Sequence, residues 1–536
     1  MLTKKKKIIS IILAAVSLLL IFLISHGSAP KGNLSGLSID EDTASSLKSS
    51  RRPSESHLLN AVFFNEEQLF FDPNANAFYY SIIEEDPDWD NPRVTIQSSS
   101  FGVQAAFVRP DCSREAIAEN RPLKLIAATD REYREYDVYL TTLPMINIQT
   151  EGVPKRVPGS FSMELLDNSG KTGTVYSKSF GTIHKRGHMS SKFDKYPLRF
   201  ILKTSVGKNE SRDATLLGLR ESNKWVLYSP YNDRDRVRNV FSTELWYRSC
   251  AQRNSFGLIN SARYKYVEVF INGSYFGLYA LGYMPDEYQL KTDSKPGEYS
   301  YKNMNWFDFR ERDISLNTCF SVVDAYSGYG IERDEYDPYT GEGTEEEFEP
   351  LQKYCDYLNE DHSLKEQLSM VDLDAYLDFY LFQNVIQGYD SARRYKTKNY
   401  FITAKKDGDQ YRYLFTPWDL DLTWGLTFTE YEMDESMNYA FGFGPFAVYF
   451  PEETEEVFQM LSERYRELRK NEWSDPAVMA ILDAFEEDIF SSGAYIRDLK
   501  SWPQSSHSKD IHNLDEFKSY VLKRLHYCDT YYGISS

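Results

Sequence analysis

Two aspartates lie in the segment Thr416-Pro417-Trp418-Asp419-Leu420-Asp421-Leu422-Thr423-Trp424-Gly425, among apolar and aromatic residues. If this segment is extended, side chains two residues apart point to the same side. Two carboxylates on one side of an apolar segment are costly to bury without a cation or a proton donor. The pair therefore points to a divalent metal, against the alternative that Asp419 caps a turn and Asp421 pairs with an arginine.

A β-hairpin is predicted directly before this segment. Strand-forming residues at 398–403 and 411–415 flank the turn Lys406-Asp407-Gly408-Asp409. Asp390 follows a predicted helix over 372–387, and the hairpin would return the chain to the same place. We therefore expect Asp390 close to the aspartate pair.

These residues have the chemistry of a phosphoryl-transfer site. Carboxylate and amide oxygens from Asp419, Asp421 and Asn399 are hard ligands that suit Mg²⁺ or Mn²⁺. A base, a metal-binding Asn and a metal-binding Asp are the parts that phosphoryl transfer needs, because the protein mainly positions phosphates and neutralises their charge.

A basic stretch runs from Gly181 to Lys203 and contains Arg186, Lys195 and Arg199. Basic residues beside a Gly/Ser turn could cradle a polyphosphate. The alternative is a solvated strand face, which these residues taken alone favour. The sequence has no GxxxxGK[ST], GxGxxG, His-Arg-Asp or Asp-Phe-Gly motif, which excludes a P-loop enzyme and an ordinary protein kinase.

A further polar segment, 223–239, leads into a predicted helix over 236–248. Asp and Asn residues before a helix are ordinary caps, so a structural role is predicted for this segment.

The N-terminus predicts export. Lys4 to Lys7 precede an uncharged apolar run from Ile8 to Ile24. The length of the run favours an uncleaved membrane anchor in residues 1–25 over a cleaved signal peptide. The four lysines would stay in the cytoplasm, which predicts a single-pass cell-membrane protein with the bulk of the chain outside the cell, or alternatively a secreted or spore-coat protein.

The composition argues against two further functions, nucleic-acid binding and zinc binding. The chain has 536 residues and a formal net charge of −19, which argues against a nucleic-acid partner that is bound through its phosphates. The five cysteines are scattered without metal-binding spacing, so a zinc site is not expected.

The predicted domains follow the composition of the chain. Residues 26–60 read as a flexible linker, 61–142 as a small β-sandwich-like module, and about 143–285 as a β-rich region. Helices dominate from about 345 to 533. The predicted helices there are 346–358, 372–387, 453–469, 476–490 and 514–529. The fold class is therefore α+β.

The chain resembles the spore coat protein H (CotH) kinase family over roughly Leu143 to Tyr532. Nine short motifs occur in the family's order, and together they are more specific than any one alone. They are Leu143 to Ile148, Lys185 to Ser191, Lys195 to Leu202, Lys224 to Asn239, Val269 to Tyr279, Asp372 to Leu377, the Asp390 segment, the Asn399 strand and Pro417 to Asp421.

The resemblance implies an atypical protein-kinase-like fold with a β-rich N-lobe (about 143–285) and a helical C-lobe (about 345–533) in a domain over 143–533. It implies that the domain binds ATP with a divalent metal and phosphorylates Ser or Thr of exported, Ser-rich proteins. By position, Asp390 matches the catalytic base and Asp419 the metal-binding aspartate, with Asn399 and Asp421 as further ligands.

Arg186, Lys195 and Arg199 match the family's phosphate-facing basic stretch. One departure is that the family usually has Thr-Glu after the strand ending Gly277-Leu278-Tyr279, where this chain has Gly282-Tyr283.

Two other classes remain open from the sequence. A non-catalytic surface or coat-assembly scaffold could keep the same fold as a binding platform. A secreted carbohydrate-active enzyme is suggested by paired carboxylates and 40 tyrosines, although it gives the basic stretch no use.

Overall fold

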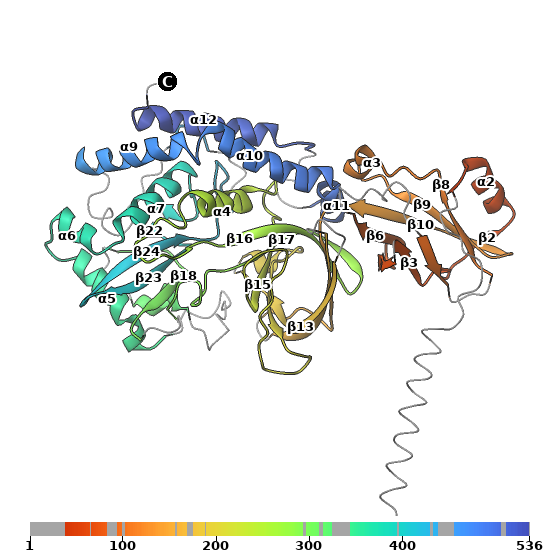
Figure 1. Ribbon diagram of the computed structural model, residues 1–536, viewed down its shortest axis with the longest axis horizontal. Coiled ribbons are helices and arrows are strands. Elements are labelled where there is room, and N and C mark those ends of the chain that lie inside the picture. The colour runs from red at the N-terminus through yellow and green to blue at the C-terminus, as the bar shows by residue number, and fades with distance from the viewer. Residues whose placement is uncertain are drawn as a thin grey trace, which may run out of the picture. The chain divides into compact units, whose positions relative to one another are not determined.

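The computed structural model describes residues 38–64, 66–82, 94–98, 102–155, 158–168, 175–187, 189–292, 296–309, 315–323, 343–393, 396–428, 433–437, 455–504 and 511–534 (Figure 1). The chain forms two compact units, Met1–Thr141 and Thr142–Ser536. The predicted membrane anchor lies outside the described residues. Among the residues described, no helix combines the length and the apolar character needed to cross a membrane.

The first unit contains two β-sheets that share one core. A larger sheet has the strand order β1-β8-β9-β10-β6-β5, with β2 paired to β10, and a smaller sheet has the order β4-β3-β7. Val62 and Phe64 of the smaller sheet are buried in the same cluster as Phe78, Leu125 and Val138 of the larger one. The elements are β1 (Ser38–Ile39), α2 (Glu41–Ser49), β2 (Arg52–Pro53), β3 (Ala61–Phe64), β4 (Glu67–Gln68), β5 (Phe70–Asp72), β6 (Ala77–Ser81), β7 (Val94–Gln97), β8 (Gln104–Val108), α3 (Arg114–Ala118), β9 (Leu123–Ala128) and β10 (Glu132–Thr141).

Residues 38–60 differ from the predicted flexible linker, because they are part of this unit. Asp40 caps α2 by accepting a hydrogen bond from the Thr43 amide, and Ala44 of that helix is buried. The Arg52 amide donates to the Arg131 carbonyl, which joins β2 to the larger sheet. Composition could not reveal these contacts, because Ser-rich and charged residues also suit a capped surface helix.

The second unit begins with a closed β-barrel of strand order β11-β12-β13-β14-β15-β17-β16. Alternate residues of each strand point inward, as the period of a strand requires, and fill the barrel with apolar side chains such as Phe200, Trp225 and Val267. Gly181 allows β13 and β14 to approach, since a Cβ there would lie 2.0 Å from the Ile201 carbonyl oxygen. The elements are β11 (Met145–Thr150), β12 (Gly159–Asp167), β13 (Val175–Lys185), η1 (Ser190–Lys192), β14 (Leu198–Lys203), β15 (Lys224–Tyr228), α4 (Arg238–Ser249), β16 (Arg263–Ile271) and β17 (Ser274–Tyr283).

The rest of this unit is mainly helical around a four-stranded sheet of order β20-β18-β23-β24. A small sheet has the order β19-β22-β21. Its strands β21 and β22 come directly before β23 in the sequence. The elements are β18 (Tyr299–Asn303), β19 (Phe307–Asp308), η2 (Leu316–Thr318), β20 (Phe320–Val322), α5 (Glu345–Leu358), α6 (Leu364–Ser369), α7 (Leu373–Val385), β21 (Ala392–Arg393), β22 (Lys396–Thr397), β23 (Tyr400–Asp407), β24 (Gln410–Pro417), α9 (Glu455–Lys470), α10 (Asp475–Glu486), η3 (Glu487–Ser491), α11 (Ala494–Ser501) and α12 (Asp515–Tyr531).

Helix α7 is the centre of this region. All its residues from Ala375 to Val385 are buried, as expected of a helix that is apolar on every side. It contacts α9, α12 and β24, and α10 contacts α4 and α12. Figure 1 shows α9, α10 and α12 running above α7 and α4.

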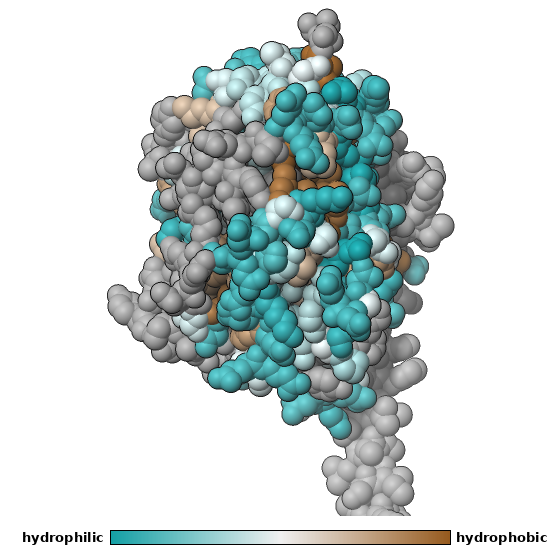
Figure 2. All heavy atoms as spheres, turned by 90° about the vertical axis from the view of Figure 1, so that its left-hand side faces the viewer, coloured by the Kyte–Doolittle hydropathy of each residue, from teal (hydrophilic) through white to brown (hydrophobic). Residues whose placement is uncertain are grey.

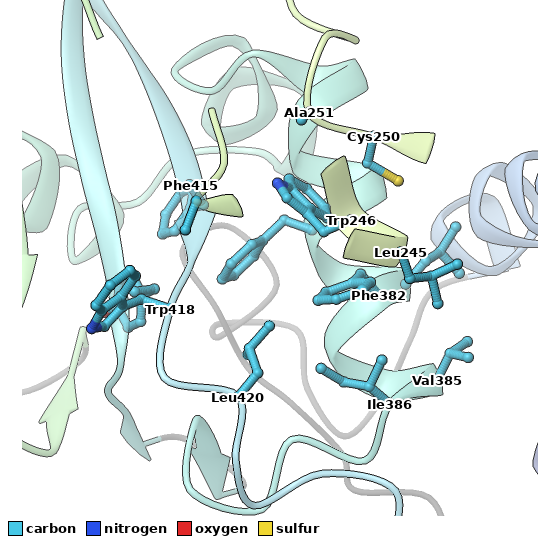
Figure 3. Close-up of a cluster of buried hydrophobic side chains, with 14 of the residues drawn as sticks. Leu245, Trp246, Cys250, Ala251, Phe382, Val385, Ile386, Phe415, Trp418 and Leu420 are labelled. Atoms are coloured by element: carbon cyan, nitrogen blue, oxygen red, sulfur yellow. The ribbon is translucent and has the colours of Figure 1, made fainter. Parts of the chain in front are cut away.

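One apolar core joins the helices to the outer face of the barrel. It includes Tyr228 of β15 and Leu278 of β17 together with Trp246 of α4 and Phe382 of α7. The ring centres of Trp246 and Phe382 are 5.1 Å apart, and Leu420 extends into the same cluster (Figure 3). In contrast, the coloured residues on the face seen in Figure 2 are mainly hydrophilic. The chain is thus a mixed α+β protein, and in its second unit one core holds the helices and the barrel together.

The first prediction concerns this core. Phe382 is fully buried, so Phe382→Ala should lower the free energy of unfolding by about 3–5 kcal/mol through lost contacts and a cavity. Tyr288→Ala is the control, because this side chain is 60% exposed and its loss should change stability by less than about 0.5 kcal/mol. Urea unfolding measures both values. Equal losses in the two variants would contradict the packing described.

Candidate functional site

Beyond Pro417 the segment is a loop and not the extended chain for which the sequence analysis placed both carboxylates on one side. Strand β24 ends at Pro417, and Asp419 has a left-handed backbone with φ of +57°. The loop is nevertheless fixed, because the Trp418 amide donates to the Asn399 carbonyl at 3.1 Å and the Trp424 amide to the Ile386 carbonyl at 2.6 Å. The aspartates therefore lie in a loop held between the hairpin and the end of α7.

Asp390 and the two loop aspartates act on one another through their charges. Burial, together with the charges of Asp419 and Asp390, raises the pKa of Asp421 to about 8, while a hydrogen bond from Asn232 opposes the shift. Burial also raises the pKa of Asp390 to about 6, with Lys398 opposing and Asp419 adding to the shift. The prediction that Asp390 returns to the aspartate pair across the hairpin is consistent with this mutual influence.

Asp390 has two oxygens in different environments. Its Oδ2 accepts hydrogen bonds from Asn399 Nδ2 at 3.0 Å and pairs with Lys398 Nζ at 2.8 Å. Its Oδ1 is buried and has no hydrogen-bond partner among the described residues. One oxygen is thus fixed by the protein and the other is available to a ligand.

Two asparagines hold the aspartate loop from the barrel side. Asn232 Nδ2 donates to Asp421 Oδ2 at 3.0 Å, and Asn239 Oδ1 accepts from the Leu420 amide at 2.9 Å. Both come from the segment interpreted as ordinary helix caps. The pairing of Lys398 with Asp390 was also not predicted. The only indication in the sequence was that Lys398 directly precedes Asn399.

Arg186 lies next to the aspartate loop. Its guanidinium carbon is 5.2 Å from the centre of the Trp418 ring, a cation–π contact. Burial raises the pKa of Tyr264, and the charges of Arg186 and Asp419 both reach this residue, Arg186 opposing the shift and Asp419 adding to it. A positive charge is therefore present beside the carboxylates. Arg199 is half-buried on β14, opposite His184 of β13.

Lys195 occupies a different environment from the one expected of a phosphate-facing residue. It is fully buried, and its Nζ lies 2.5 Å from Oδ1 of Asp498 in α11. Oδ2 of Asp498 accepts from Arg236 Nε at 3.1 Å, and its Oδ1 also accepts from the Leu278 amide at 3.0 Å. Burial lowers the pKa of Lys195 to about 8, and the Asp498 charge opposes the shift. Contact between Lys195 and a phosphate stays a prediction.

Two glycines of β17 explain how α11 and β16 pack against this strand. Gly277 has φ of +126°, and a Cβ there would lie 2.5 Å from Asp498 Oδ1. Gly282-Tyr283 stands where the family usually has Thr-Glu, and a Cβ at Gly282 would lie 2.3 Å from the Tyr264 ring. A side chain has no room at Gly282, so the glycine belongs to the close packing of β16 and β17.

The donor set of the loop suits a divalent metal, although no complete metal site is preformed. Within the described ranges, no group of three or more His, Cys, Asp or Glu side chains is arranged to hold an ion. Asp390 Oδ1 and the Tyr228 hydroxyl are among the buried polar atoms with no hydrogen-bond partner in the described residues. Burial, followed by the charge of Asp421, raises the pKa of Tyr228. A cation held by hard oxygen ligands would relieve the repulsion between Asp419 and Asp421.

The comparison with protein families covers the same residues. The family model described as CotH kinase protein matches residues 183–528. This range contains the aspartate loop, Asp390, Asn399 and the basic residues. A search of curated proteins finds no match.

The second prediction concerns the buried ion pair. Asp498→Ala should lower the free energy of unfolding by about 3–5 kcal/mol, because it leaves the Lys195 and Arg236 charges buried without their carboxylate. Asp483→Ala removes a 64% exposed aspartate that pairs with Lys518 and should cost less than about 1 kcal/mol. Urea unfolding distinguishes the two. The double variant Lys195→Met/Asp498→Ala should lose less than the sum of the single losses.

The third prediction concerns pH. A carboxyl whose pKa is raised above 3.8 on folding keeps its proton in the folded state where the unfolded chain has lost it, so stability falls as pH rises through this window. With a chelator present, Asp421 should lower stability from about pH 4 to about pH 8, by at most about 1.4 kcal/mol per pH unit.

Asp421→Asn should remove this dependence. The difference in unfolding free energy between the unmodified protein and the variant, measured at pH 6 and pH 8, isolates Asp421 from Asp390 and Lys195, which titrate in both proteins. A difference that stays constant between the two pH values would show that Asp421 is ionised over the whole range.

Proposed function

The chain belongs to the CotH kinase protein family, and from this premise we propose that it is an exported, metal-dependent protein kinase that transfers the γ-phosphate of ATP to Ser or Thr side chains. The observation that carries the proposal is the environment of Asp390. A carboxylate with one oxygen fixed by Lys398 and Asn399, and with the other buried and without a hydrogen-bond partner among the described residues, suits a general base in a phosphate-binding site.

In the proposed reaction the acceptor hydroxyl oxygen bonds to the γ-phosphorus of ATP, and the bond from that phosphorus to the β,γ-bridging oxygen breaks. ADP leaves with the bond electrons. The hydroxyl proton passes to Asp390 Oδ1 and from there to solvent. A carboxyl with pKa of about 6 is largely ionised at neutral pH, so it can accept this proton.

Asp419, Asp421 and Asn399 are the residues that would hold Mg²⁺ or Mn²⁺. When bound, the metal would neutralise charge on the phosphates of ATP. The chain's own contribution is to fix these ligands, since the Leu420 amide between the aspartates is tied to Asn239 and the amide before Asp419 to Asn399. Arg186 adds a positive charge next to Asp419.

Export and the acceptor are part of the proposal. The lysines Lys4 to Lys7 and the apolar run Ile8 to Ile24 support a single-pass anchor with the kinase outside the cell. The family relationship supports Ser-rich surface or spore-coat proteins as acceptors. The same relationship supports a kinase-like division of the second unit, with the barrel as N-lobe and the helical region as C-lobe.

The fourth prediction tests transfer directly. The full chain is incubated with labelled ATP, Mg²⁺ or Mn²⁺, and a Ser-rich protein such as dephosphorylated casein. Asp419→Asn and Asp390→Asn should each reduce incorporation by on the order of 100-fold or more, because they remove a metal ligand and the base.

Asp407→Asn is the matched control for this experiment. Asp407 lies at the opposite end of the same hairpin, where it pairs with Arg412, so its loss should leave transfer unchanged. Incorporation that persists in Asp419→Asn, or its absence from the unmodified protein, would refute the proposal.

A non-catalytic scaffold is the second candidate, and one observation favours it. Gly282-Tyr283 stands where the family usually has Thr-Glu, so the chain lacks the family glutamate at this position. Calorimetry separates the two functions. A kinase should bind ATP in a metal-dependent way that Asp419→Asn abolishes, whereas a scaffold should show no ATP binding with Mg²⁺ or Mn²⁺.

A further inference from the structure

Lys398 is enclosed by two aromatic rings beside Asp390. Its Nζ lies 5.2 Å from the centre of the Trp306 ring and 5.9 Å from that of Phe428, and only 20% of its side chain is exposed. Ring faces attract a cation, and the attraction strengthens as water is excluded. The rings therefore hold the ammonium at its 2.8 Å contact with Asp390 Oδ2.

The backbone around Lys398 fixes its direction. Its amide donates to the Ser391 carbonyl at 2.9 Å, directly after strand β22. The next residue, Asn399, has a left-handed backbone with φ of +61°. This turn lets two consecutive side chains reach the same carboxylate. In an extended strand, the two side chains would point to opposite faces.

Both side chains act on one oxygen. Asn399 Nδ2 and Lys398 Nζ contact Oδ2 of Asp390, while Oδ1 is buried with no hydrogen-bond partner among the described residues. A carboxylate held at one oxygen by two donors, one of them charged, has a fixed plane and a fixed free oxygen.

We propose that Lys398 is a positioning residue of the transfer reaction, which with Asn399 holds Asp390 so that Oδ1 is presented to the acceptor hydroxyl. This inference rests on the proposed function. Lys398 acts through Asp390 and exchanges no proton, since the hydroxyl proton goes to Oδ1. Trp306 and Phe428 keep the ammonium in place.

The experiment uses steady-state kinetics of the full chain with labelled ATP and dephosphorylated casein. Lys398→Met should lower kcat by on the order of 30-fold or more, because a misplaced base loses proximity and alignment. KM for ATP should stay within about threefold and the melting temperature within about 2 °C, because the change acts on the acceptor step. Lys398→Arg should recover most of kcat, because a guanidinium also donates to a carboxylate.

Lys396→Met is the matched control. It makes the same chemical change two residues earlier, at an exposed position of β22, and should leave kcat unchanged. If the role of Lys398 were merely structural, Lys398→Met would lower the melting temperature and would not lower kcat selectively while KM stays the same.

Three results would overturn the inference while transfer by the unmodified protein persists. They are an unchanged kcat in Lys398→Met, a Lys398→Arg variant as slow as Lys398→Met, and a higher KM for ATP with kcat unchanged, which would make Lys398 a nucleotide-binding residue. Absence of transfer by the unmodified protein would overturn the proposed function and this inference with it.

Discussion

The anchoring of the aspartate loop in the apolar core is the constraint on which the site depends. Three apolar residues flank the two aspartates of the loop and are buried in the core that joins the barrel to the helices. They are Trp418, Leu420 and Trp424. Their burial stabilises a loop that carries two repelling carboxylates. Backbone hydrogen bonds from Trp418 and Trp424 then tie the loop to Asn399 and to the end of α7. The core therefore supplies the energy that keeps the charged residues close together.

The buried carboxylates of the second unit lie in two kinds of environment, with and without a cationic partner. Glu268, Asp378 and Asp498 are completely buried, and each pairs with an arginine or a lysine: Arg497, Arg464 and Lys195 respectively. Such pairs offset the cost of removing a charge from water. Asp421 instead has an amide partner, Asn232, and two carboxylate neighbours. Burial, followed by the charges of those neighbours, raises its pKa. The chain neutralises its structural carboxylates and leaves those of the loop short of positive charge, as a site for a cation would require.

Local sequence patterns predicted the elements that depend on local interactions. The hairpin around Gly408 and the helices α4, α5, α7, α9 and α12 lie close to the predicted ranges, because turn residues and apolar periodicity act over a few positions. The expected approach of Asp390 to the aspartate pair, which rests on the hairpin returning the chain, is consistent with their mutual influence.

Contacts between distant segments could not be predicted in this way. Asp498 meets Lys195 across 303 residues, and Asn232 meets Asp421 across 189, so no local pattern records either pair. Helix α11, which carries Asp498, is only eight residues long, and its docking depends on Gly277 and on ion pairs such as Arg497 with Glu268. Lys398 gave too weak a signal, because a lysine before a strand is common on protein surfaces.

Backbone strain gives an independent reason to regard the loop as functional. Gln387, Asn399, Asp419 and Trp424 all have φ between +50° and +61°, a region that favours glycine. These residues lie at the end of α7, at the start of β23 and in the aspartate loop, around one place in the fold. Non-glycine residues in this conformation cost on the order of 1 kcal/mol each, and glycine would remove the cost. At Asn399 and Asp419 glycine would also remove the amide that holds Asp390 and the carboxylate that acts on its pKa, so the strain is explained by the need for those side chains.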